Sequence, residues 1–502
     1  MKRRVIQAGL LASVVISGVA AQATQAAGTI QLVQELRHDV SPPLRVLAAA
    51  NMADGKAAND AAAQGLTVTQ NAATLGLNFA GINGTGVYHE SDSNGSVGAT
   101  QYVQWVNANF AVYSKTTGQV LMKSTSAETL WAGFGGLCQT TNAGDGIILY
   151  DKAAGQWLIS HHSGGSAGIL QCVAISTTSD ATGSYYRYAF PLTTQFPDWP
   201  KIGIWPDAYY VSMNLEDFGS YHSIGAEVCA LDRTNMLRGN TTNPAQCFTT
   251  GTPTLDYVLM PSDLDGATPP PVGSPNYLLS LDVDGLDLYQ FHVDWATPAN
   301  STLSGPTFIP VMPFKQLCVN GGACISQPGT TDLLDSLGDR VMFRLAYRNF
   351  GTYESLVSNH TVTKGSGSGI RWYEIRSPRT SPVVYQQETF APDSNYRFVG
   401  SVAMDHLGDM MGGYVISSST VFPGIRFSGR LVTDPLSTWE TEQIIAAGGG
   451  SLPANDHSLT DLSSISIDPV DDCTFWYTAA YAKTSGVDWS TWIASLKWPG
   501  CS

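Results

Sequence analysis

Short runs of apolar and aromatic residues recur along most of the chain, and each run alternates with polar positions or stops at a turn. From about residue 76 these runs are separated by Gly, Pro, Asp and Asn. Such runs predict β-strands, and the residues between them predict tight turns. The expected strands fall into seven units of three or four, which cover residues 102–122, 146–190, 201–231, 256–295, 341–390, 399–432 and 463–498.

This pattern of units predicts an all-β fold. Four-stranded antiparallel units repeated along a chain, without helices between them, are typical of a β-propeller. A single sandwich is excluded because about 425 residues exceed what one sandwich holds. We therefore predict a seven-bladed β-propeller, although six or eight blades fit the same pattern. The seventh unit has only three strands, so we expect residues 77–82 to supply its fourth and close the ring.

Two segments precede the predicted propeller. Residues 1–27 begin with Met1-Lys2-Arg3-Arg4, continue as an apolar run and end in small residues, which is the pattern of a cleaved signal peptide. The apolar run is shorter than the ~20 residues that a spanning helix needs. Residues 28–75 read as an N-terminal arm, and 76–502 as the propeller. We therefore predict a secreted protein, extracellular or periplasmic, with no transmembrane segment.

The cysteines agree with export. An even number of cysteines in an exported chain predicts disulfides, and no pair has the CxxC spacing of zinc or haem sites. Neighbours along the chain are the expected partners: Cys138–Cys172, Cys229–Cys247, Cys318–Cys324 and Cys473–Cys501.

The amino-acid composition excludes some classes of function. The net charge is −15, from 26 basic and 41 acidic residues, and only 13% of residues are charged. An acidic chain lacks the basic surface that nucleic acid requires. The 43% of hydrophobic residues excludes disorder as the main state. We expect a monomer whose partner is a carbohydrate.

Propeller geometry sorts the polar residues by face. Loops that lead into the first strand of a blade share one face with loops that join its second and third strands. The lead-in loops contain a recurring acid: Asp92, Asp145, Asp198, Asp339, Asp393 and Asp461. We assign to the same face a group of histidines: His161, His162, His222, His292 and His360. Asp and Asn are also favoured in turns for backbone reasons alone, which is the structural alternative.

A rim of carboxylates, imidazoles and aromatic rings suits a carbohydrate site. Paired carboxyls can serve as acid and as base or nucleophile, and histidine can transfer protons near neutral pH. The catalytic candidates are Asp145, Asp198, Asp393, His292 and His360. The substrate-binding candidates are Arg340, Arg397, Glu216, His162, Trp199 and Trp372. The acidic rim weighs against a polyanionic substrate unless Arg340 and Arg397, or a bound cation, offset it.

One short motif suggests a metal. The sequence SDSNG at 91–95 resembles a fragment of a calcium loop, with Asp92 and Asn94 as ligand candidates for a structural Ca²⁺. It lacks the distant Glu of a complete EF-hand loop. No other cofactor is indicated, because HExxH and phosphate-binding glycine loops are absent.

Two segments resemble the Asp box, the turn motif of sialidase-like propellers. They are STTSDATGSYYRY at 176–188 and SGVDWSTW at 485–492, and both depart from the motif in the placement of glycine. Longer stretches, such as FPDWPKIGIWPDAYYVSMN and LDSLGDRVMFRLAYRNFGTYES, are similar to secreted bacterial proteins predicted as sialidase-like propellers. The resemblance spans most of the chain from residue 76 and implies fold and compartment, since that group has no settled activity. The lead-in NDHSLTDLSS departs from the group, which puts a role for Asp461 in doubt.

Three functional hypotheses follow. The leading one is a carbohydrate-active enzyme that cleaves glycosidic bonds, as a glycoside hydrolase or, if His and Tyr act on a uronic acid, as a polysaccharide lyase. The alternative is a non-catalytic propeller at the cell surface that binds a glycan or a protein. The third is an ion-stabilised scaffold. A sialidase proper would need three converging arginines, and MFRL around Arg344 resembles only the first such motif.

Overall fold

The computed structural model describes residues 28–51, 72–84, 90–165, 168–218, 222–250, 258–318, 321–453, 459–486 and 488–502. The predicted signal peptide, 1–27, lies outside these ranges. Within them the chain is all-β, with strands β1 to β32 and three short α-helices. The helices are α1 (Leu44–Asn51), α2 (Leu137–Thr140) and α3 (Arg233–Met236).

Three antiparallel sheets come from the first half of the chain. The first contains β4 (Asn94–Val97), β5 (Gln101–Val106), β6 (Asn109–Ser114) and β7 (Val120–Ser126). The second contains β8 (Ile147–Asp151), β9 (Gln156–Gly165), β10 (Gly168–Ser176) and β11 (Tyr185–Phe190). The third contains β12 (Phe196–Ile204), β13 (Tyr209–Glu216), β14 (Ser223–Leu231) and β15 (Ala245–Thr249).

The second half continues this pattern. An eight-stranded sheet joins β16 (Met260–Asp265), β17 (Asn276–Leu281), β18 (Gly285–His292) and β19 (Thr302–Pro310) to β22 (Leu345–Asn349), β23 (Glu354–Lys364), β24 (Gly367–Arg376) and β25 (Val383–Phe390). The junction between its two halves is the parallel pair β16–β22. The last two sheets contain β26 (Tyr396–Met404), β27 (Met410–Ser417), β28 (Gly424–Arg430) and β29 (Gln443–Ala446), and then β30 (Ser464–Ile467), β31 (Phe475–Tyr481), β32 (Ser490–Lys497) and β3 (Thr74–Asn83). A separate pair is formed by β20 (Ala323–Ile325) and β21 (Leu334–Asp335).

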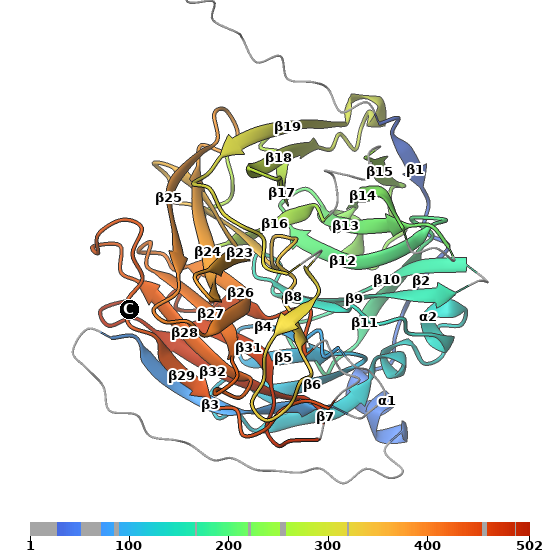
Figure 1. The fold of residues 1–502 in the computed structure, drawn as a ribbon. Coiled ribbons are helices and arrows are strands. Elements are labelled where there is room, and N and C mark those ends of the chain that lie inside the picture. Colours follow the sequence, from blue (N-terminus) through green and yellow to red (C-terminus); the bar gives the residue numbers. More distant parts are fainter. Residues whose placement is uncertain are drawn as a thin grey trace, which may run out of the picture.

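The first strands of these sheets touch in a cyclic order. Going round, β4 contacts β8, β8 contacts β12, and the contacts continue through β16, β22, β26 and β30 back to β4. Figure 1 shows the sheets arranged around a common centre. Second strands such as β5, β13 and β27 are buried along nearly their whole length, because neighbouring sheets cover both of their faces. The hydrophobic core therefore lies between sheets.

The N-terminal segments complete sheets that are built from distant residues. Strand β3 pairs antiparallel with β32, with Phe79 opposite Ile493, so the pairing expected of residues 77–82 is present. In the arm, β1 (Gln31–Val33) pairs with β15 and β2 (Arg37–Val40) pairs with β11. These short outer strands were not predicted from the sequence, because their side chains are mostly exposed and show no apolar alternation.

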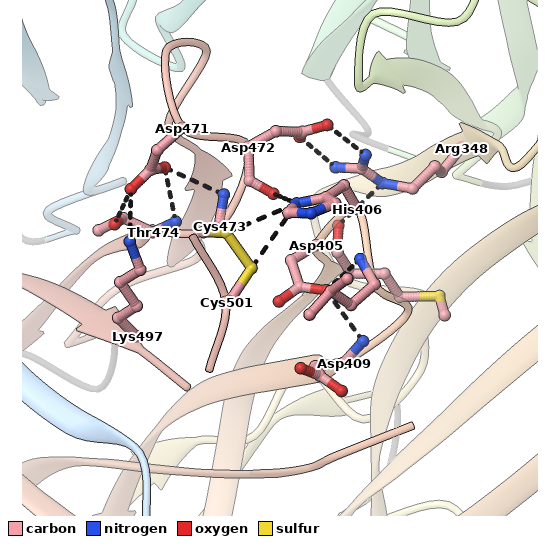
Figure 2. The surroundings of a disulfide bond; sticks show 12 residues. Arg348, Asp405, His406, Asp409, Asp471, Asp472, Cys473, Thr474, Lys497 and Cys501 are labelled. Carbon is pink, nitrogen blue, oxygen red and sulfur yellow. Dashed lines mark hydrogen bonds and ion pairs between the residues drawn. A yellow bond between two sulfur atoms is a disulfide. The ribbon is translucent and has the colours of Figure 1, made fainter. Parts of the chain in front are cut away.

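All four predicted disulfides are confirmed: Cys138–Cys172, Cys229–Cys247, Cys318–Cys324 and Cys473–Cys501. Figure 2 shows the last of these, which ties the segment before β31 to the end of the chain. His406 Nδ1 lies 3.5 Å from Cys473 Sγ and 3.6 Å from Cys501 Sγ. The sulfurs are bonded to each other and so are not thiolate metal ligands. No helix in the described ranges is long and apolar enough to span a bilayer.

A buried ionic network links the first strands. The Arg344 guanidinium donates to Asp263 Oδ2 at 3.1 Å, to Asp265 Oδ2 at 2.6 Å and to the Ile465 carbonyl at 3.0 Å. These partners belong to β16 and β30, while Arg344 precedes β22. Lys152, which follows β8, adds an ion pair with Asp265 at 3.3 Å. Strands β8, β16, β22 and β30, which belong to three sheets, are thereby connected through one charged cluster.

Candidate functional site

One backbone turn recurs where the chain enters the first strand of a sheet. Asp92, Asp145, Trp199, Val258 and Val399 all have positive φ, between 41° and 62°. Residues other than glycine rarely adopt this conformation, so its recurrence in five sheets marks a repeated structural device. In β12 and β26 the turn coincides with a shift in strand register. The turns of neighbouring sheets therefore bring corresponding residues together near the centre.

Three acids from these turns gather around a buried lysine. Asp92, Asp145 and Asp198 all interact electrostatically with Lys201, the third residue after Asp198. The Lys201 ammonium is buried, donates to the Pro200 carbonyl at 3.1 Å and lies 3.7 Å from the centre of the Trp199 ring. Burial lowers the pKa of Lys201 to about 8, although the carboxylates oppose the shift.

The pKa values of Asp92 and Asp145 are shifted in opposite directions. Burial and the neighbouring Asp145 carboxylate raise the pKa of Asp92 well above its usual value. Burial would also raise the pKa of Asp145, but His162, the hydrogen bond from Asp92 and Lys201 together lower it. The Asp145 carboxylate further accepts from the Trp199 amide at 3.1 Å. A proton held by this pair therefore resides more readily on Asp92 than on Asp145.

Two further acids extend the cluster. Burial and Asp145 raise the pKa of Asp198, which accepts a hydrogen bond from Asn214 Nδ2 at 3.3 Å. Burial and Asp198 raise the pKa of Glu216 to about 7, while Arg340 opposes both shifts. Glu216 is partly exposed, so solvent reaches this residue.

Three buried polar atoms at this centre have no hydrogen-bond partner within the described part of the chain. They are Asp92 Oδ1, His162 Nδ1 and Trp199 Nε1. Burial lowers the pKa of His162, although Asp145 and Asp198 favour its charged form. Because buried polar groups are normally paired, these atoms are suited to bind a polar ligand.

The structure thus brings together seven residues predicted from the sequence: Asp92, Asp145, Asp198, His162, Trp199, Glu216 and Arg340. Arg340 comes from the segment before β22, forms an ion pair with Asp339 at 2.9 Å and lies 5.3 Å from the Trp199 ring. Asp461 also contributes to the field at Asp92 and Lys201.

Asp393 and Arg397 lie in a different ion-pair group. The Arg397 side chain is fully buried and donates to Asp393 at 2.7 Å and to Glu442 at 2.7 Å. Its hydrogen bond to Asp393 is the main reason that the pKa of that carboxyl falls to about 2. With its donors engaged, Arg397 is a structural residue that links the start of β26 to the segment before β29.

His360 and Trp372 are part of the packing around β23 and β24. His360 is fully buried, with Nε2 2.8 Å from the Tyr373 hydroxyl and its ring edge against Phe314. Burial lowers the pKa of His360 to about 3, so it stays neutral at physiological pH. Trp372 is also buried and stacks on Trp439, with ring centroids 5.6 Å apart.

His292 lies on the opposite face from the one assigned to it. It ends β18, the third strand of its group, whereas the assignment required the end of a second strand. His292 interacts electrostatically with Asp207 and lowers the pKa of that carboxyl. Asp207 lies in the turn between β12 and β13, at the opposite ends of the strands from Asp145. The assignment failed because β17 and β18 are joined by a very short turn, which reverses the chain once more before His292.

The predicted calcium ligands are engaged within the protein. The Asn94 side-chain amide donates to the Asp92 and Gly146 carbonyls at 3.0 and 2.6 Å, and its oxygen accepts from the Ile148 amide at 3.0 Å. Burial and Asp145 raise the pKa of Asp92, which disfavours its ionised form, and the charge of the Lys201 ammonium also acts on this carboxyl. This donor set does not fit Ca²⁺, which prefers several ionised oxygen ligands.

Sequence reasoning missed Lys201, Asn214 and Asn107. Asn107 Oδ1 accepts from the Asp145 amide at 2.9 Å and holds the turn from the neighbouring sheet. Lys201 begins the run KIGIW and was taken only as a strand residue. The signal was its position directly after the Asp198-Trp199 turn.

Comparisons with known proteins add little to this geometry. No protein-family profile and no curated protein sequence matches the chain. Solved structures that it resembles include an ulvan lyase of a new polysaccharide lyase family (11% identity, TM-score 0.40, 80% of this chain and 90% of that one). Others are the phage phi92 endosialidase (11%, 0.39, 71% and 67%) and the Hadza microbial sialidase Hz136 (8%, 0.38, 80% and 74%). All three are named as carbohydrate-active enzymes, but similarity at this level says nothing of the reaction here.

Proposed function

We propose that residues 76–502 form a seven-bladed β-propeller, closed by β3 as the fourth strand of the last blade. The cyclic contacts of seven first strands and the pairing of β3 with β32 support this proposal. Residues 31–40 of the arm add outer strands to two blades. Export after cleavage of residues 1–27 is supported by the four disulfides, which persist in oxidising compartments.

The proposed reaction is hydrolysis of glycosidic bonds in a poly- or oligosaccharide. One observation carries this proposal: a single cluster contains carboxyls whose pKa values are driven in opposite directions, with Asp145 lowered and Glu216 raised to about 7. Glycoside hydrolysis requires such a pair, an ionised carboxylate and a protonated carboxyl. Asp145 is then the base or nucleophile, and Glu216 is the acid that protonates the leaving oxygen.

The other residues of the cluster support these two roles. Lys201 and Asp92 keep Asp145 ionised, the first by its charge and the second by its hydrogen bond. Asp198 raises the pKa of Glu216 and so preserves its proton. Arg340 and His162 are suited to bind the hydroxyls of the sugar, since both border the carboxyls.

The test is a panel of polysaccharides scored for new reducing ends and for unsaturated products. We expect reducing ends from the wild-type protein and a loss of about 10²–10⁴-fold in kcat/KM for Asp145→Asn and Glu216→Gln. Asp284→Asn, which changes an exposed aspartate in the turn between β17 and β18, is the matched control and should keep full activity. Unsaturated products would show that the protein is a lyase and not a hydrolase. Retention on a polysaccharide without turnover would show that it is a binding propeller.

A further inference from the structure

An exposed aromatic pair borders the carboxyl cluster. Phe218 follows β13 and is 46% exposed, which is high for a ring of this size. It packs edge to face against Phe196, the first residue of β12, with ring centroids 6.1 Å apart and an interplanar angle of 78°. Phe196 therefore holds Phe218 in place while one side of the Phe218 ring remains open to solvent.

The pair is joined to the cluster on two sides. Phe196 lies directly opposite Glu216 in the β12–β13 register. On its other side it receives the edge of the His162 ring, with centroids 6.4 Å apart. The register of β13 and β14 shifts at Glu216, and Ile224, 38% exposed, lies at this irregularity. The apolar surface of the phenylalanine pair and Ile224 thus lies next to the titratable groups of Glu216 and His162.

Trp199 does not offer such a surface. Its ring is buried, with the Lys201 ammonium 3.7 Å from its centroid and the Arg340 guanidinium 5.3 Å away. These cations occupy the positions that a stacked sugar would need. Among the described residues beside this centre, Phe218 offers an exposed aromatic ring instead.

We propose that Phe218, supported by Phe196, is a subsite that stacks against one sugar ring of a carbohydrate chain next to the Asp145–Glu216 centre. The inference rests on the proposed function. A sugar ring combines an apolar C–H face with a hydroxyl edge, and the platform matches the first while Glu216 and His162 match the second. A protein partner would require a much larger apolar area than two phenylalanines and Ile224 supply.

The experiment measures binding apart from turnover. Asp145→Asn protein is run by affinity electrophoresis through gels that contain arabinan, xylan or polygalacturonate, and the same is done after adding Phe218→Ala or Phe218→Trp. We expect Phe218→Ala to weaken retardation about tenfold in at least one gel and Phe218→Trp to preserve it. Phe308→Ala is the matched control, because Phe308 is 48% exposed on the outer strand β19. A melting temperature within about 2 °C of the parent confirms that the exposed Phe218 can be removed without unfolding.

The outcomes separate the two proposals. Equal retardation of Phe218→Ala and its parent, or no retardation in any gel, overturns the subsite. Phe218-dependent retardation without products from the wild-type protein overturns the hydrolase and keeps the subsite. Cleavage with a KM that Phe218→Ala leaves unchanged keeps the hydrolase and overturns the subsite.

Discussion

Replacing Arg344 by methionine tests the ionic network that connects the first strands. Methionine is of similar length but leaves the buried Asp263 and Asp265 without their main partner, although the charges of Lys152 and Arg348 still act on Asp265. Removing one member of a buried ion pair costs about 3–5 kcal/mol. For a folded unit of about 430 residues the unfolding entropy is about 0.9 kcal/mol/K, which gives a fall in Tm of about 3–6 °C.

The assay is thermal and urea unfolding at several pH values. Without Arg344 the folded-state pKa values of Asp263 and Asp265 rise, and a carboxyl whose folded pKa is raised destabilises the protein above its unfolded pKa. The deficit should therefore be largest at pH 7 and shrink as the pH falls toward about 4. Arg45→Met is the matched control, because Arg45 and Asp180 form an exposed ion pair worth at most about 1 kcal/mol. If Arg344→Met lowers Tm no more than Arg45→Met does, the network is not holding the strands together.

Three further predictions concern the site, the rim and the disulfides. Lys201→Met should raise the pKa of Asp145 and so move the acid limb of the kcat/KM profile to higher pH. Lys201→Arg keeps the positive charge and should move this limb less. The alkaline limb is set by Glu216, with a pKa of about 7, and should stay in place in both variants. Asp393→Asn should leave kcat/KM unchanged and lower the free energy of unfolding in urea by at most about 1 kcal/mol at pH 6. This loss should narrow toward pH 2, because the folded pKa of Asp393 is about 2 and its stabilisation disappears as the pH falls through that value. A large loss of activity would show that Asp393 belongs to the site. Replacing both Cys473 and Cys501 by alanine opens a loop of 28 residues and should cost about 3–4 kcal/mol in urea unfolding, and an unchanged midpoint would contradict this.

Much of the fold could be predicted because its signals are local. Strand runs and turns recur with regular spacing, and each cysteine pairs with its neighbour along the chain, since each bridge joins adjacent segments of one region. The gathering of Asp92, Asp145 and Asp198 was predictable for a similar reason. Asp92 and Asp145 precede first strands and Asp198 lies near the start of one, and such positions converge in this architecture.

The wrong predictions concern residues whose position depends on contacts between distant segments or on the direction in which a strand or side chain points. His292 was misplaced because one extra short turn reverses the chain direction. His360 and Trp372 lie on buried strands, where the direction of a side chain changes with every residue and depends on what packs against it. Arg397 donates to Glu442, which lies 45 residues away in the sequence. No local sequence pattern predicts this contact. Lys201 was taken only as a strand residue because two of its carboxylate neighbours, Asp92 and Asp145, come from the turns of other sheets.

The pairing of β3 with β32 has a consequence for how the chain folds. Residues 74–83 are synthesised long before their partner strand at 490–497. Contacts this far apart in sequence slow folding, because a very long loop must close before the pairing gains any stability. Until then the outer edge of β32 and the arriving β3 both expose unpaired backbone. If residues 1–27 direct export as proposed, this interval falls after translocation, where a chaperone that shields strand edges would raise the yield of folded protein.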